Sequence, residues 1–177
     1  ALELMKKKLD LDQSFISSIL STFSPQIVDV IKNKKFILMT GHRRENFGNS
    51  YINILRAVKN VCKTNPEINV IFPVHLNPTV QKFVKKELSG LPNVCLLEPL
   101  NYPQFIFLLK KCFFVITDSG GIQEEAPSFG KIVIVTRVIT ERNEAMESGR
   151  SILVGTNYDN IVTSCNNIIN IRQDKLE

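Results

Sequence analysis

Short apolar runs rich in β-branched residues recur along the chain from Lys35 onward, separated by longer segments with helical spacing. In one such segment, Ile52, Leu55, Val58 and Cys62 share a helical face. The predicted strands are 36–39, 70–74, 94–97, 113–117, 132–135 and 151–154, and the predicted helices are 51–63, 80–88, 103–111 and 159–171. This alternation predicts an α/β fold with a doubly wound, Rossmann-like parallel sheet of about six strands and helices on both faces.

The beginning of the chain follows another pattern. Segments 2–11 and 15–31 have helical spacing with no strand between them. We therefore expect residues 1–34 to form a helical lead-in or interdomain linker and residues 35–177 to form the Rossmann-like domain. No glycine-rich turn follows the first predicted strand, which is typical of the second half of a two-domain protein. We expect an N-terminal domain to be absent from this chain.

The composition is that of an ordinary globular chain. The 177 residues are 44% hydrophobic and 22% charged, with 8 Gly and 8 Pro, which excludes collagenous, disordered and disulfide-scaffold classes. The apolar runs are far shorter than the ~20 residues that cross a bilayer, and we expect no secretory leader. We expect a soluble, cytoplasmic protein with no membrane partner.

Charge and cysteine usage narrow the candidate partners. The net charge of +5 comes largely from scattered lysine pairs without interleaved aromatic residues, so a small phosphate compound is a better candidate partner than nucleic acid. The four cysteines have no CxxC spacing and no neighbouring histidine. They indicate reduced thiols, and we expect neither a metal nor a cofactor.

The sequence Asp118-Ser119-Gly120-Gly121 follows the fourth predicted strand and leads into a helix. Ligands of open α/β sheets bind outside the carboxyl ends of the strands, and two glycines let a backbone approach a phosphate closely. The Ser119 hydroxyl can add a donor. An ordinary glycine-rich turn with Asp118 or Ser119 as the helix cap explains the same residues equally well.

Two carboxylates follow this turn. We expect Glu124 and Glu125 to lie in the first turn of the helix, one accepting from two ribose hydroxyls and the other complementing the helix dipole. Pro127 and Gly130 are predicted to end the helix early.

Basic residues follow other strands at the same edge. His42 and Arg43 come after the first strand, His75 after the second and Arg142 after the fifth. The alternatives are solvated arginines and, for His75 alone, capping of a turn between two prolines. After the third strand comes Phe105, whose ring we expect in the core while the nearby backbone reads a pyrimidine edge.

Five segments, in this order and spacing, carry a family resemblance: GHRRENFG, PVHLNP, EPLNY, TDSGGIQEEAPSFGK and TERNEA. Together they resemble the non-hydrolysing bacterial UDP-N-acetylglucosamine (UDP-GlcNAc) 2-epimerases from Lys35 to about Cys165. The resemblance implies a two-domain architecture like that of GT-B glycosyltransferases. This chain would then be the linker and the C-terminal, UDP-binding domain.

The resemblance also implies residue roles around the phosphates. Ser119, Gly120 and Gly121 would hold the diphosphate of UDP. His42 and Arg142 would lie at the phosphates, which makes His42 the candidate catalytic residue.

Other roles concern the nucleoside and a second ligand. Glu125 would bind the ribose hydroxyls, and Phe105 would contact uracil through its backbone. Arg43 and His75 resemble the pair that contacts a second, activating UDP-GlcNAc in some members.

The implied activity is that of an isomerase of polysaccharide biosynthesis, which interconverts UDP-GlcNAc and UDP-ManNAc by eliminating and re-adding UDP. Because the proton-transfer carboxylates would belong to the absent domain, we expect this chain alone to be inactive, and the complete enzyme to be a homodimer. Two alternatives stay open: the nucleotide-sugar-binding half of a GT-B glycosyltransferase, and a non-catalytic UDP-sugar-binding module.

Overall fold

The computed structural model describes residues 1–41, 48–138 and 150–174. The strands are β1 (Lys35–Met39), β2 (Ile68–Pro73), β3 (Val94–Leu97), β4 (Phe114–Thr117), β5 (Val133–Val135) and β6 (Ser151–Leu153). The helices are α1 (Leu2–Leu11), α2 (Gln13–Leu20), α3 (Pro25–Asn33), α4 (Asn49–Thr64), α5 (Pro78–Leu88), α6 (Tyr102–Lys111), α7 (Gly120–Glu125), the 3-10 helix η2 (Ala126–Phe129) and α9 (Tyr158–Asp174).

The strands form one parallel sheet in the order β3-β2-β1-β4-β5-β6. From β1 the chain winds outward through β2 to β3, then returns to place β4 on the other side of β1. This confirms the predicted doubly wound α/β fold. The winding reverses between β1 and β4, which makes their carboxyl ends the switch point of the sheet, where such folds bind ligands.

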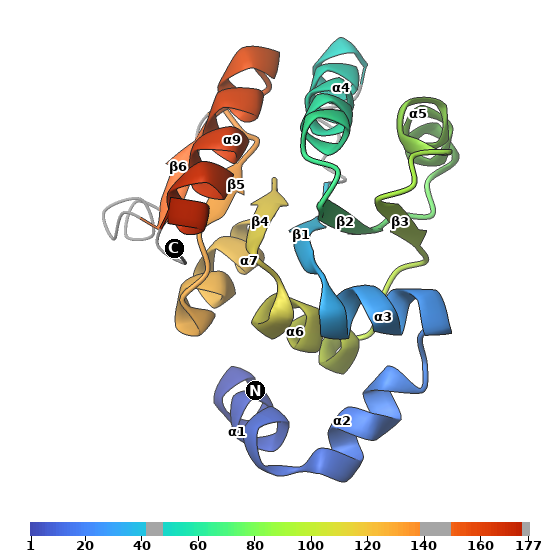
Figure 1. Cartoon of the computed structure of the whole chain (residues 1–177), viewed down its shortest axis with the longest axis vertical. Helices are drawn as coiled ribbons and strands as arrows, with labels where there is room; N and C mark the ends of the chain where they lie inside the picture. Colours follow the sequence, from blue (N-terminus) through green and yellow to red (C-terminus); the bar gives the residue numbers. More distant parts are fainter. Residues whose placement is uncertain (42–47, 139–149, 175–177) are drawn as a thin grey trace.

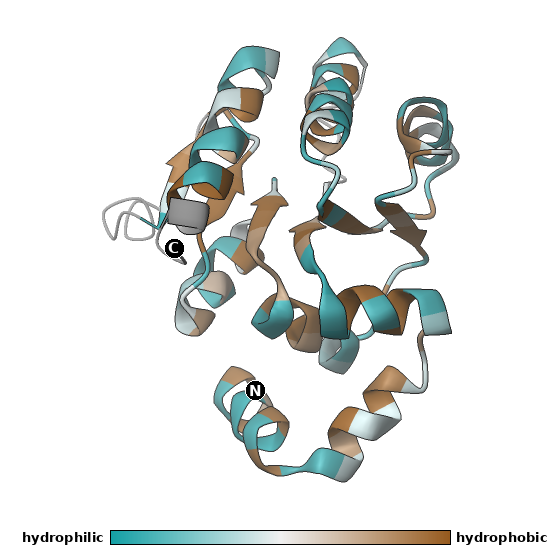
Figure 2. Cartoon of the chain, viewed as in Figure 1, coloured by the Kyte–Doolittle hydropathy of each residue, from teal (hydrophilic) through white to brown (hydrophobic). Residues whose placement is uncertain are grey.

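Helices cover both faces of the sheet. Figure 1 shows α4, α5 and α9 on one face and α3 and α6 on the other, with α1 and α2 beyond α6. Along β1, Ile37 and Met39 pack toward the first group of helices, while Phe36 and Leu38 pack toward the second. All four are buried, and Figure 2 shows the apolar character of the strands. Burial on both faces accounts for apolar runs where a one-sided sheet would alternate.

The N-terminal helices pack against the α6 side of the domain. Leu9 of α1, Ile19 of α2 and Ile27 of α3 join one buried cluster with residues of α6. The single helix expected over 15–31 is wrong, because the chain breaks between α2 and α3. Ser24 accepts a hydrogen bond from the Ile27 N–H and caps α3, while Pro25 occupies its first turn without needing an N–H partner. The division into a linker and a domain stays a prediction.

The four cysteines are buried and form no disulfide. Burial raises the pKa of the Cys62 thiol to about 12 and that of Cys165 further still. Within the residues described above, no helix combines the length and apolar character that a membrane span requires. The same residues contain no group of three or more His, Cys, Asp and Glu side chains that could hold a metal ion.

Candidate functional site

Two threonines join the strands at the switch point. Thr40, directly after β1, donates its N–H to the Ile116 carbonyl at 2.9 Å. Its hydroxyl lies 2.7 Å from the hydroxyl of Thr117, which ends β4. The carboxyl ends of β1 and β4 are therefore fixed to each other by both main chain and side chains. The sequence analysis did not single out either threonine, because only the winding of the sheet brings them together.

The Ser119 turn lies directly beyond this pair. The Ser119 N–H donates to Thr117 Oγ1 at 3.0 Å, while the Ser119 side chain makes no capping hydrogen bond to α7. Gly121 is exposed, and a Cβ built there would meet only Ser119 Oγ, at 3.9 Å. Gly120 is buried beside it. The turn thus presents a hydroxyl next to an open stretch of backbone, as a phosphate site requires.

A buried carboxylate lies behind the turn. Asp118 is 1% exposed, and a Cβ on Gly41 would lie 3.7 Å from its Oδ2. The Tyr51 hydroxyl donates to the Gly41 carbonyl at 3.3 Å. Burial, and secondarily the charge of Asp118, raises the pKa of Tyr51, so this phenol stays a neutral donor. Tyr51 therefore positions the backbone that leaves β1.

The apolar periodicity of α4 explains why sequence reasoning assigned no polar role to Tyr51. Its aromatic ring is a core residue, 1% exposed, as that periodicity implies. Its hydroxyl finds a partner only because β1 and α4 pack side by side in the fold.

The two carboxylates of α7 occupy a different part of the helix from the one predicted. Glu124 and Glu125 end this short helix and leave its first turn without an acidic residue, so their predicted first-turn position is wrong. The helix is short because η2 follows at once and ends at Gly130, whose φ of 70° is left-handed. That early end was predicted from Pro127 and Gly130.

The position of Glu125 brings it toward α6. It is half-buried, and burial, followed by the charge of Glu124, raises the pKa of its carboxyl. Burial, and then the charge of Glu125, raises the pKa of Tyr102 in the first turn of α6. Glu125 therefore lies within electrostatic reach of α6, the helix that carries Phe105. Tyr102 therefore lies near the candidate site, although the sequence predicted no role for it.

The N-terminus of α6 is fixed in place. The Asn101 side chain accepts from the Gln104 N–H, and Gln104 Oε1 accepts from the Asn101 N–H, which completes a capping box. Gln104 Nε2 also donates to Thr22 Oγ1 at 2.8 Å, which ties α6 to the segment between α2 and α3. Phe105 packs its ring against the core, as predicted.

The predicted second-ligand residues are only partly described. His75 follows β2 and is exposed, and its Nδ1 accepts from the Asn77 N–H at 3.1 Å. This is the turn-capping arrangement that had been weighed as an alternative for His75. The residues His42, Arg43 and Arg142 lie outside the described part of the chain.

A family model described as UDP-N-acetylglucosamine 2-epimerase matches residues 4–177. The chain belongs to this epimerase family. A UDP-N-acetylglucosamine 2-epimerase of Campylobacter jejuni is 48% identical over 177 residues, which are all of this chain and 46% of that protein. Another, from Yersinia pestis, is 47% identical over 137 residues, 77% of this chain and 36% of that protein. The chain thus spans less than half the length of these epimerase relatives.

Solved structures of the family agree. The UDP-GlcNAc 2-epimerase of Neisseria meningitidis bound to UDP-GlcNAc is 40% identical with a TM-score of 0.89, over 97% of this chain and 45% of that one. A Staphylococcus aureus MnaA–UDP co-structure is 42% identical with a TM-score of 0.79, over 84% and 41%. Fold and family therefore confirm the resemblance carried by the five sequence segments.

Proposed function

We propose that this chain is the UDP-binding half of an enzyme that interconverts UDP-GlcNAc and UDP-ManNAc. The Ser119–Gly121 turn carries the proposal: its hydroxyl makes no capping bond, its backbone is open at Gly121, and Thr117 holds it at the switch point. Family membership favours an epimerase over the glycosyltransferase half considered from the sequence.

The diphosphate binds at the turn. The Ser119 hydroxyl and the N–H groups of Gly120 and Gly121 donate to phosphate oxygens, because the first N–H groups of a helix have no acceptor within it. The side chains of His42 and Arg142, placed at the phosphates by family resemblance, add positive charge.

The nucleoside extends from the turn toward α6. Glu125 accepts hydrogen bonds from the two ribose hydroxyls, and the backbone at Phe105 contacts the uracil edge. The charge of Glu125 contributes to the raised pKa of Tyr102, which supports this path because it indicates that Glu125 lies within electrostatic range of the first turn of α6.

The reaction is an anti elimination followed by re-addition. A base removes the C2 proton, the C1–O bond breaks with its electron pair leaving on UDP, and a C1–C2 double bond forms. UDP then adds back at C1 while C2 regains a proton on the opposite face. Groups that stabilise charge on departing UDP lower the barrier, which is the catalytic role of His42.

The C2 proton is handled by residues of a further N-terminal domain, joined through the linker 1–34. The 177-residue chain alone therefore binds UDP but does not turn over. Arg43 and His75 contact a second UDP-GlcNAc that activates the complete enzyme, which is a cytoplasmic homodimer.

Thermal unfolding with nucleotides tests the binding step. UDP stabilises the chain more than ADP does, because the base contacts select a pyrimidine; the gain is about 2.7 kcal/mol at a concentration 100 times Kd. Ser119→Ala weakens the UDP response, while Ser128→Ala, in the exposed part of η2, leaves it unchanged. Absence of any UDP response overturns the proposed site.

Complementation tests the reaction. The chain is joined to the part of the Campylobacter jejuni relative that it does not cover, and UDP-ManNAc is measured from UDP-GlcNAc without an acceptor. Product from the joined protein and none from the chain alone is expected. UDP binding without product from the joined protein indicates the non-catalytic module instead.

A further inference from the structure

A pocket of about 610 Å³ lies at the amino ends of β1, β2 and β3, the edge of the sheet opposite the Ser119 turn. It is bordered by the residues that precede these strands and by the last turn of α4. Its volume falls within the ~300–1,000 Å³ typical of small-molecule sites. The proposed UDP site uses none of these residues.

Two buried asparagines line the pocket. Asn69 is 6% exposed and Asn93 is 8% exposed. Asn93 Nδ2 donates to the carbonyls of Cys62 at 2.9 Å and Ile68 at 2.8 Å. Carbonyls only accept, so these bonds fix the orientation of the amide and leave Oδ1 as an acceptor. Asn69 Nδ2 donates to the Lys35 carbonyl at 3.5 Å. This bond likewise leaves the Oδ1 atom of Asn69 as an acceptor.

Neither asparagine Oδ1 has a hydrogen-bond partner within residues 1–41, 48–138 and 150–174. Neither atom is among the buried polar atoms that lack a partner, so each is reached from the pocket rather than sealed in the core. Since both side chains line the pocket, a donor that enters the pocket can reach them. Hydroxyl groups of a bound molecule have this chemistry.

The walls and rim of the pocket indicate two further features that a ligand should have. Leu91 and Pro92 give it an apolar wall, suited to the C–H face of a sugar ring. Lys34 and Lys63 are exposed at the rim together with Glu67. Lys34 is ion-paired with Asp29 at 3.7 Å, so Lys63 is the rim lysine that has no ion-pair partner within the described residues. Lys63 lies in the last turn of α4, where its charge offsets the negative end of the helix dipole and offers a contact for an anionic group.

We propose that this pocket binds a small polyhydroxylated anion of the sugar-phosphate class. Ligand hydroxyls donate to the Oδ1 atoms of Asn69 and Asn93, the ring packs on Leu91 and Pro92, and the phosphate lies near Lys63. The site is separate from the UDP site, so each can be tested without the other.

The test is an NMR titration of the 177-residue chain that follows the side-chain amides of Asn69 and Asn93. Glucose 6-phosphate is the probe, with glucose and inorganic phosphate as half-probes, each at about 10 mM to detect a millimolar Kd. Glucose 6-phosphate is expected to shift both amides more than either half-probe does. No shift, or an equal shift with phosphate alone, overturns the proposal.

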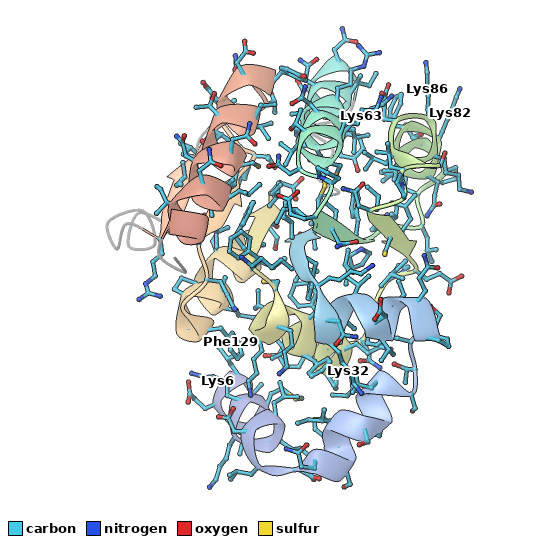
Figure 3. The ribbon with its side chains drawn as sticks, viewed as in Figure 1. Lys6, Lys32, Lys63, Lys82, Lys86 and Phe129 are labelled. Atoms are coloured by element: carbon cyan, nitrogen blue, oxygen red, sulfur yellow. The ribbon has the colours of Figure 1, made fainter. Side chains whose placement is uncertain are left out.

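Charge reversal locates the binding. Lys63→Glu is expected to weaken glucose 6-phosphate binding about fivefold, whereas Lys82→Glu, on α5 and outside the pocket, leaves it unchanged. Figure 3 shows Lys63 on α4 and Lys82 and Lys86 on α5. Lys63 and Lys82 are both exposed, so neither Lys63→Glu nor Lys82→Glu is expected to disrupt the fold. Equal loss in the two variants, or displacement of the probe by UDP, overturns the assignment to this pocket.

Discussion

The hydroxyls of Thr40 and Thr117 lie 2.7 Å apart at the point where β1 and β4 diverge. The Thr117 oxygen also accepts the Ser119 N–H at 3.0 Å. One buried atom thus connects the two central strands and orients the turn proposed to hold the diphosphate. Stability and ligand binding should consequently respond together to changes at Thr117.

We predict that Thr117→Val lowers the free energy of unfolding by about 1–3 kcal/mol, because the half-buried Ser119 N–H and the Thr40 hydroxyl both lose their partner. The same change weakens UDP binding, measured by isothermal titration calorimetry, since the turn is no longer held. Thr117→Ser keeps the oxygen and should retain most of both properties. Normal UDP binding by the Thr117→Val variant would show that the turn binds UDP without this hydrogen bond.

Alanine substitutions at Gly121 and Gly90 should have opposite effects on UDP binding and on stability. The Gly121 backbone is outside the left-handed region and a Cβ has room, so Gly121→Ala should leave unfolding unchanged but obstruct the diphosphate and reduce the UDP response. Gly90 has a φ of 84° in open space, so Gly90→Ala should cost about 1 kcal/mol of stability and leave UDP binding intact. Chemical denaturation and calorimetry on both variants check this crossed pattern. Loss of stability in Gly121→Ala would contradict it.

Glu125 carries a pH prediction. Its pKa is raised above the ordinary 4.5 by burial and by Glu124, so its charged form is disfavoured in the folded state. Its contribution to stability is most favourable below pH 4.5 and is lost as the pH rises through the raised pKa. Glu125→Gln should therefore raise the melting temperature at neutral pH, with the gain fading below pH 4.5.

The same substitution should weaken UDP binding at neutral pH, because the amide replaces one of the two acceptors proposed for the ribose hydroxyls. Glu124→Gln, on the exposed neighbour, is the control and should bind UDP nearly as well. Comparable losses in both variants would argue against a specific role for Glu125.

Lys6 connects the first helix to η2. Its ammonium donates to the Ser128 carbonyl at 3.1 Å and lies 5.4 Å from the centre of the Phe129 ring. Lys6 and Phe129 are labelled in Figure 3. Lys6→Ala should lower stability by about 0.5–1 kcal/mol, whereas Lys7→Ala, at an exposed position of the same helix, should have little effect. Urea unfolding midpoints of the two variants measure the difference. Equal midpoints would show that α1 docks without this contact.

The fold was largely predictable because its signal is local. Runs such as Phe36 to Met39 are apolar at every position, as strands buried on both faces must be. The break between α2 and α3 was missed although Ser24 and Pro25 form a recognisable helix start, because apolar residues continue on both sides of it.

The site was predictable in composition but not in geometry. Ser119 and Gly121 stand out in the sequence by their chemistry. The roles of Thr40, Thr117 and Tyr51 depend on strands and a helix far apart in the sequence meeting at one edge of the sheet. Glu125 was placed in the wrong turn because sequence periodicity cannot measure where a helix as short as α7 begins.

Burial of the cysteines has a practical consequence for following this chain in solution. Burial raises the pKa of the Cys62 thiol and keeps it protonated at neutral pH, whereas only thiolates react readily with alkylating reagents. The folded chain should resist labelling, while transient opening exposes thiols of ordinary reactivity. The rate at which the native cysteines are alkylated, followed as an increase in mass, therefore reports how often the core opens. No introduced probe is needed.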